Sequence, residues 1–180
     1  CVGELQLPLN NCGVMALDYS TKHGVATSIG HSPVSALIDP NAGSKNSIAE
    51  ALTNIIWAPI ENGLKGVSLS ANWMWPCKNE GEDARLYKAV ESVSKFAIEL
   101  GINIPTGKDS LSMNQKYENL EVKSPGTVIV SATAHCNNIS NIIEPVFKLD
   151  KGSIFYINLS SDDFKLGGSA FSQIIGNIGN

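Results

Sequence analysis

Short apolar segments alternate along this sequence with longer segments whose apolar residues recur every three or four positions. Residues 67–71 and 127–134 have the pattern of strands. Residues 46–60 and 86–100 carry apolar side chains at helical spacing, and Gly101 follows the second of these segments as a helix stop signal. The alternation predicts an α/β or α+β domain in which helices pack on a sheet.

Weaker signals fill the gaps between these four segments. Residues 12–17 and 102–104 are expected to form short strands, the first of them buried. Turn-forming residues predict interruptions of regular structure at residues 72–76, at residues 105–107 and, as a hairpin, around residues 124–126. These interruptions set the expected ends of the neighbouring strands.

The composition changes near residues 148–152, where a charged segment divides the chain. This charged segment precedes residues 153–159, which have a strand pattern, and a helical pattern begins at Ala170. We therefore expect a first domain at residues 1–149 and the truncated beginning of a second α/β domain at residues 150–180. Both ends of the chain are expected to be cuts within a longer polypeptide.

Composition argues against several classes of protein. A formal charge of -4, with one arginine and no basic cluster, provides little of the positive field that a nucleic-acid binder needs. The longest apolar runs hold about nine residues, against the roughly 20 of a membrane-spanning helix. Four cysteines occur without a Cys-x-x-Cys pair, which indicates neither a zinc site nor a disulfide framework. We expect a cytoplasmic globular protein with reduced thiols and neither nucleic acid nor membrane as a partner.

The densest group of chemically useful residues lies between Gly107 and Met113. Gly107 lets backbone approach a ligand, Lys108 supplies positive charge to a phosphate and Ser110 can donate a hydrogen bond to it. Asp109 could hold a magnesium ion or orient the lysine. The spacing is not that of a Walker loop, so the pattern alone also fits a solvated polar turn.

Glu50 and Asn54 are four residues apart on a predicted helix and therefore share one of its faces. Both side chains offer oxygen, the ligand that magnesium prefers. The alternative is an exposed glutamate beside an asparagine that bonds locally. Further along, Asn72 follows a predicted strand, where sheet proteins often place ligand contacts.

Six segments, in order and spacing, resemble the large form of the phosphoribosylformylglycinamidine synthase family. The resemblance implies the N-terminal-like domain of the second of two aminoimidazole-ribonucleotide-synthetase-like repeats, a mixed sheet with helices packed on it, followed by the start of that repeat's C-terminal-like domain. Any one segment is weak evidence, whereas six in register are specific. They are Cys1–Gln6, Ala49–Asn54, Ser70–Met74, Gly81–Ala84, Gly107–Met113 and Leu166–Ala170.

The resemblance implies a reaction of purine biosynthesis. Formylglycinamide ribonucleotide, ATP and glutamine-derived ammonia would become formylglycinamidine ribonucleotide, ADP and phosphate. The implied cofactors are ATP or ADP and Mg²⁺, and the implied partners are the first repeat and the glutaminase domain of the same polypeptide. This chain alone is expected to be inactive and able to pair with a second copy. The alternative role is a non-catalytic module that holds ADP-magnesium and pairs with the first repeat.

By the same resemblance, Glu50 and Asn54 are magnesium ligands of a structural ADP site. At a third ligand position, where relatives have aspartate after alanine, this chain has Asn10 and Asn11. We assign Asn11 to the metal and Asn10 to the nucleotide. An amide in place of a carboxylate is expected to weaken magnesium binding, because ligand charge raises affinity for a hard cation.

The segment Gly107–Met113 resembles a loop that serves the catalytic site across the interface between the two repeats. Gly107 would then lie near ATP, and Ser110 would hold the substrate phosphate. Lys108 and Asp109, which differ from shorter relatives, are assigned to the catalytic site as the group that neutralises charge and the group that orients an ion or the lysine. Asn72 is a further expected nucleotide contact.

Overall fold

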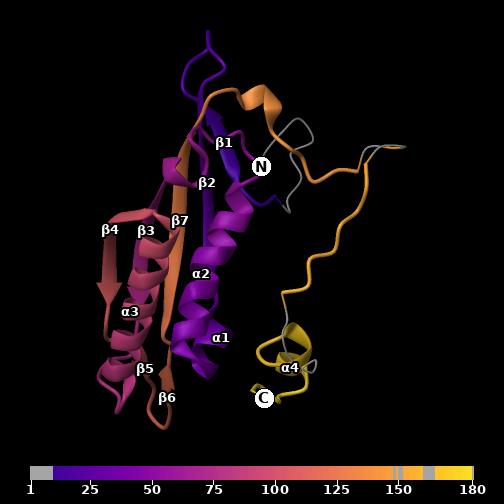
Figure 1. Ribbon diagram of the computed structural model, residues 1–180. Helices are drawn as coiled ribbons and strands as arrows, with labels where there is room; N and C mark the ends of the chain where they lie inside the picture. Colours follow the sequence, from indigo (N-terminus) through magenta and orange to yellow (C-terminus); the bar gives the residue numbers. More distant parts are fainter. Residues whose placement is uncertain (1–9, 148, 150–151, 160–164, 180) are drawn as a thin grey trace.

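A mixed five-stranded sheet forms the centre of the computed structural model, which describes residues 10–147, 149, 152–159 and 165–179 (Figure 1). The strand order is β1-β2-β7-β3-β4, in which β3 and β4 are parallel and the other neighbours are antiparallel. Two short strands, β5 and β6, form a separate hairpin. The strand bounds are β1 Gly13–Ala16, β2 Gly24–His31, β3 Val67–Met74, β4 Asn103–Ser110, β5 Asn114–Lys116, β6 Glu121–Lys123 and β7 Thr127–Cys136.

Three helices cover one face of this sheet (Figure 1). Helix α2 packs on β2 and β7, while α1 and α3 pack on α2. Among the described residues, no helix is long and apolar enough to cross a membrane. The predicted fold class, a mixed sheet with helices packed on it, is confirmed. The helix bounds are α1 Pro33–Ile38, α2 Pro40–Ile55, α3 Glu82–Leu100 and α4 Ala170–Ile174, with short 3₁₀ turns at Gly63–Gly66 and Ile139–Asn141.

Side-chain burial alternates along the central strands, as expected for a sheet with one covered face. On β7, Val128 and Val130 are buried beneath the helices, and Ile48 and Ile55 of α2 are buried against the same face. The opposite face, which we call the open face, carries Ile29, which is 57% exposed and in register with Ser131, among several short hydroxyl side chains. Those in cross-strand register are Thr27, Thr133 and Ser68 in one row, and Ser131, Ser70 and Thr106 in the next.

Two of the predicted interruptions were wrong. Residues 72–74 continue β3, and residues 105–107 lie inside β4, which pairs with β3 from Asn103 to Ser110. Proline is tolerated in β4 because this strand is at the edge of the sheet, where a missing N–H costs little. Gly107 is required by close packing, since a methyl group there would lie 2.1 Å from the carbonyl oxygen of Ala71. The edge position of β4 explains its proline, and the tight contact with Ala71 explains Gly107.

The sequence signals also missed strand β2 and helix α1 and misplaced one further helix. Strand β2 was not predicted, because its buried positions are small residues such as Gly30, where a methyl group would lie 2.1 Å from Ser47 O. Helix α2 begins at Pro40 and ends at Ile55, earlier than the predicted 46–60. Asp39 caps its first turn by accepting a hydrogen bond from Asn41 N, 2.8 Å.

Further corrections concern exposure and turns. Strand β1 occurs inside the predicted residues 12–17, but it is not buried, since Met15 is 75% exposed. The hairpin turn lies at residues 117–120, between β5 and β6, and not at 124–126. Helix α3 ends as predicted, with Gly101 in the left-handed conformation as its C-cap.

Beyond β7 the chain leaves the sheet (Figure 1). The predicted strand at 153–159 was wrong, because residues 152–159 form no strand and their apolar side chains are exposed. A helix does begin at Ala170, and the turn before it lies against α1, since a methyl group on Gly168 would be 2.8 Å from Val34 Cγ1. Residues 1–6 of the family resemblance and the charged residues 148, 150 and 151 lie outside the described residues, and the domain boundary stays a prediction.

Candidate functional site

Glu50 and Asn54 reach from α2 to the edge of β2. Strand β1 pairs with β2 only between Gly24 and Thr27, so the next residues of β2 extend beyond it. There Glu50 Oε2 accepts a hydrogen bond from the backbone N–H of His31 at 2.6 Å, and Asn54 Nδ2 donates to the carbonyl oxygen of Ile29 at 3.0 Å. The two side chains thus take the place of a neighbouring strand. The predicted shared helix face is present, and it faces the sheet edge.

A groove of about 620 Å³ lies beside this edge. It brings together Asn10, Asn11 and Asn54, three of the residues predicted to bind nucleotide or metal, with backbone and side chains of β2 and β7. Because Asn54 uses its nitrogen on Ile29, its oxygen is the atom that can accept from a ligand or bind a cation. Glu50 lies on the same helix face one turn away.

The donor set beside the groove suits a cation only weakly. Glu50 supplies one carboxylate, and Asn11 and Asn54 supply neutral amides, whereas magnesium is held mainly by carboxylates and phosphates. Over the part of the chain that the structure describes, no cluster of three or more histidine, cysteine, aspartate or glutamate side chains could hold a metal ion. Phosphate oxygens of a bound nucleotide would have to complete such a site.

A smaller cavity of about 140 Å³ adjoins the groove, and Asn10, Asn11 and Cys12 line both. Trp57 and Ile143 give it a mainly apolar wall. Burial, with a smaller effect of Cys136, raises the pKa of the Cys12 thiol. A thiol that is harder to ionise is a poor nucleophile, so a structural role suits Cys12.

Strand β4 separates the residues of the predicted phosphate loop onto two faces. Lys108 and Ser110 alternate with Asp109, so they face opposite sides of the sheet. Lys108 is in register with Asn72 on β3, and its Nζ donates to Ser110 Oγ at 3.1 Å. A positive charge, a hydroxyl and an amide are therefore brought together on the open face.

The other two residues of this segment border a different hollow. Gly107 and Asp109 contribute to a groove of about 470 Å³ between β4 and α3, which Leu86 and Val90 of α3 also line, and Lys108 borders this groove as well. Strand geometry thus separates the Asp109 carboxylate from the Lys108 ammonium, and Ser110 is the side chain that lysine contacts.

The two groups of candidate residues lie at opposite ends of one cross-strand row. His31, which bonds Glu50, is in register with Ile129, which is in register with Asn72 and then Lys108. At about 4.8 Å per strand, the backbones of His31 and Lys108 are roughly 14 Å apart. The structure therefore supports two separate sites and not a single one.

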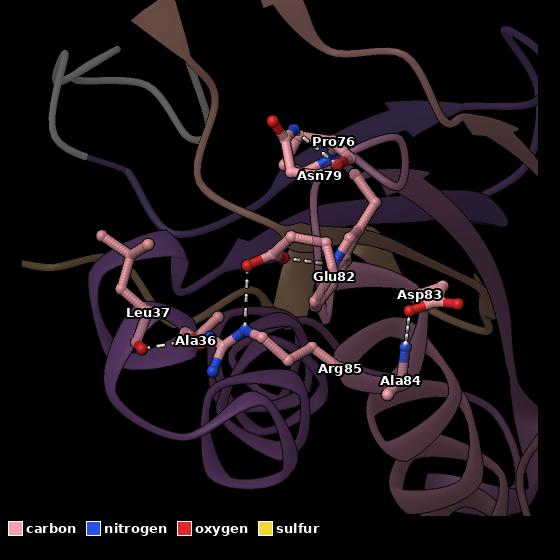
Figure 2. Close-up of polar contacts among 9 residues, drawn as sticks. Ala36, Leu37, Pro76, Asn79, Glu82, Asp83, Ala84 and Arg85 are labelled. Atoms are coloured by element: carbon pink, nitrogen blue, oxygen red, sulfur yellow. Dashed lines mark hydrogen bonds and ion pairs between the residues drawn. The ribbon is translucent and has the colours of Figure 1, made fainter.

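Sequence reasoning missed a polar network around the one arginine of the chain (Figure 2). Arg85 Nη2 donates to the carbonyl oxygens of Ala36 at 2.6 Å and Leu37 at 3.0 Å, near the end of α1, where a cation is favoured. Arg85 Nε also lies 3.4 Å from Glu82 Oε1, and Glu82 Oε2 accepts from the indole of Trp75 at 2.8 Å. The sequence signal that could have indicated this network is the spacing of Glu82 and Arg85, which are three residues apart at the start of a helix.

The fold is similar to that of solved PurL structures. A solved structure of Thermotoga maritima PurL complexed with FGAR matches with a TM-score of 0.61 at 15% identity, covering 74% of this chain and 20% of that one. The same PurL complexed with ADP matches with a TM-score of 0.57 at 16% identity, covering 74% and 21%. At such identities the likeness establishes the fold alone.

The family follows from sequence comparison. The family model described as the FGAR-AT PurM_N-like domain matches residues 1–135, and this chain belongs to that family. The probable phosphoribosylformylglycinamidine synthase of Caenorhabditis elegans is 44% identical over 182 residues, and the phosphoribosylformylglycinamidine synthase of Homo sapiens is 38% identical over 181 residues. Each match covers 99% of this chain and 14% of the relative. The predicted resemblance is confirmed, and the chain spans about one seventh of the length of these relatives.

Proposed function

We propose that this chain is part of an ATP-dependent synthase that converts formylglycinamide ribonucleotide, glutamine-derived ammonia and ATP into formylglycinamidine ribonucleotide, ADP and phosphate. The observation that carries the proposal is the match of 99% of the chain to synthases at 38 to 44% identity. The alternative of a purely non-catalytic module gains no support from these relatives, whose names are those of the synthase.

In this proposal the open face at β4 binds the substrate anion. The Lys108 ammonium and the Ser110 hydroxyl contact each other, so both can turn to one phosphate group without a change in backbone. Asn72, in register with Lys108, adds an amide for the nucleotide or the substrate. Gly107 and Asp109 border the groove between β4 and α3, where we assign Gly107 to ATP and Asp109 to an ion or a neighbouring module.

The edge of β2 is the proposed second site, for ADP and magnesium. Asn10 and Asn11 border the groove from the N-terminal side, and Asn54 borders it from α2. Glu50 would supply the single carboxylate, and bound magnesium would neutralise phosphate charge. With an amide at position 11, magnesium binding here is expected to depend on the nucleotide.

We also propose partners and a location from family membership. The glutaminase domain and the first repeat would belong to the same polypeptide, which acts in the cytoplasm as a glutamine amidotransferase. The exposed edge of β4 is the part of this chain best suited to pair with another module, because an edge strand presents backbone groups that can extend a sheet. A second copy of the isolated chain could occupy the same edge.

The test is substitution of Ser110 and Lys108 to alanine in the complete polypeptide. Each change should raise KM for formylglycinamide ribonucleotide on the order of tenfold or more, because a charge-assisted phosphate contact is lost. The melting temperature should stay within about 2 °C, since surface substitutions change stability little. Ser68→Ala, on the open face of β3, is the matched control. Unchanged steady-state kinetics in both variants would overturn the assignment of the β4 site.

A further inference from the structure

The backbone that carries Ser110 is held by the residues that follow β3. We call residues 75–82 the clasp segment. The backbone N–H of Trp75 donates to the carbonyl oxygen of Ser110 at 2.9 Å, and that of Cys77 donates to Leu111 O at 3.0 Å. The position of Ser110 therefore depends on where the first residues of the clasp segment lie.

Trp75 is the fixed point of this segment. Its side chain is fully buried, so its indole N–H needs a partner inside the protein. That partner is Glu82 Oε2 at 2.8 Å. The ring also packs against Gly126 so closely that a methyl group there would lie 2.3 Å from its Cε2 atom, which leaves the ring little room to shift.

Glu82 is held in turn by Arg85 and α1. Its second carboxylate oxygen lies 3.4 Å from Arg85 Nε, and Arg85 Nη2 donates to the carbonyl oxygens of Ala36 and Leu37 (Figure 2). Both partners are only partly exposed, with about 29% of the arginine and 25% of the glutamate side chain accessible. One carboxylate thus joins the indole of Trp75 to α1 through the guanidinium group.

We infer that Glu82 is a positioning residue for the β4 site: by holding the indole of Trp75, it sets the placement of Ser110 and of Lys108 bonded to it. The inference rests on the proposed function, in which these two side chains bind the substrate phosphate. Glu82 itself lies outside the site and reaches it through the indole of Trp75 and the backbone hydrogen bond from Trp75 to Ser110. A small displacement is sufficient to matter, because binding groups act only within a narrow range of distances.

The experiment measures kcat and KM for formylglycinamide ribonucleotide in the complete synthase with Glu82→Ala, Glu82→Gln and Trp75→Phe. Glu82→Ala and Trp75→Phe should each raise KM on the order of tenfold, with kcat changed by less than about threefold, the pattern of lost ground-state binding. Glu82→Gln keeps an acceptor for the indole and should restore KM to within about threefold of the unmodified enzyme. Because Glu82→Ala and Trp75→Phe remove the same hydrogen bond, the double variant should raise KM no more than the single variant with the larger effect.

Two controls separate this inference from the proposed function. Glu91→Ala removes an exposed carboxylate of α3 that pairs with Lys95 and should leave KM unchanged. Ser110→Ala reports on the site itself. A raised KM in Ser110→Ala together with unchanged KM in Glu82→Ala would overturn the positioning role and leave the proposed function intact. Unchanged KM in both Ser110→Ala and Lys108→Ala would overturn the assignment of the β4 site on which this inference rests.

A loss of stability alone would also contradict the inference. A general effect on folding would lower kcat or the yield of active enzyme without a selective rise in KM, and Glu82→Gln would show no recovery. Should Glu82→Ala fail to fold, Trp75→Phe addresses the same question, because phenylalanine keeps an aromatic ring at this buried position and removes the N–H donor together with part of the indole. An unchanged KM in that variant would overturn the positioning role.

Discussion

The two ends of the sheet differ in whether side chains bond to the exposed backbone at the edge. At β2 the backbone beyond β1 is bonded by Glu50 and Asn54, so two polar side chains with ligand chemistry already have structural partners. At β4 no side chain among the described residues covers the outer edge in this way, and the side chains of Lys108 and Ser110 bond to each other. The first site is built into the stability of the fold, whereas the second can be altered with little effect on it.

The largest expected effect compares two glycines. Gly30→Ala at β2 would place a methyl group 2.1 Å from Ser47 O beneath α2, and Gly107→Ala at β4 would place one 2.1 Å from Ala71 O. The first contact cannot relax, because a helix lies over it, and it should lower the free energy of unfolding by about 3 kcal/mol; the edge strand can shift and should lose about 1–2 kcal/mol. Urea denaturation followed by tryptophan fluorescence measures both. Equal losses would contradict the difference between the two edges.

The next effect concerns the carboxylate at β2. Glu50→Ala removes the acceptor of the His31 N–H, and because this hydrogen bond is exposed and water can replace the acceptor, the free energy of unfolding should fall by about 0.5–1.5 kcal/mol. Glu50→Gln keeps an acceptor of the same shape and should recover most of this loss while still failing to bind magnesium. Thermal unfolding with and without ADP and magnesium separates the two roles. If Glu50→Ala is as stable as the unmodified chain, the structural role of the carboxylate is wrong.

A gain of function tests the amide at position 11. Asn11→Asp adds a second carboxylate beside the groove and should raise magnesium affinity in the presence of ADP by about tenfold, because ligand charge increases the affinity for hard cations. Isothermal titration with magnesium measures the change. Asn10→Asp, one residue away, is the control for added charge without the assigned ligand position. Equal gains in both variants would indicate general electrostatics only.

The smallest effect lies in the turn that joins β1 to β2. Hydrogen bonds from Thr21, and from Ser20, lower the pKa of Asp18 to about 2, below its model-compound value of 3.8. A carboxyl group whose pKa is lower in the folded state stabilises the fold above about pH 4, and this contribution is lost as the pH falls toward 2. Asp18→Asn should therefore be slightly less stable than the unmodified chain at pH 7 and equal to it at pH 2. A difference that grows as the pH falls would contradict the assignment.

Some of the fold could be predicted because large apolar residues carry a clear period. Residues 86–100 and the stop at Gly101 were predicted correctly as part of α3, and β7 was found by its apolar run. Strand β2 was not, since α2 approaches it too closely for large side chains. Pro105 and Gly107 predicted a turn, and only the neighbours of β4 in the sheet show that both suit an edge strand.

The candidate sites were predictable to a similar extent. Spacing alone places Glu50 and Asn54 on one helix face, but their backbone partners are on β2, some 20 residues away in sequence and joined only by folding. Alternation along a strand would have separated Asp109 from Lys108 had β4 been recognised. The arginine network depends on the meeting of α1 with α3, which local sequence does not encode.

The open face described above has a consequence for hydration. Threonine and serine side chains such as Thr27, Ser68 and Ser131 form hydrogen bonds with water about as readily as with protein, so little is gained by drying this surface. A partner that lies over these rows of hydroxyl groups can be aligned by hydrogen-bond directions, either directly or through bridging water, and the exposed Ile29 on the same face offers it an apolar contact.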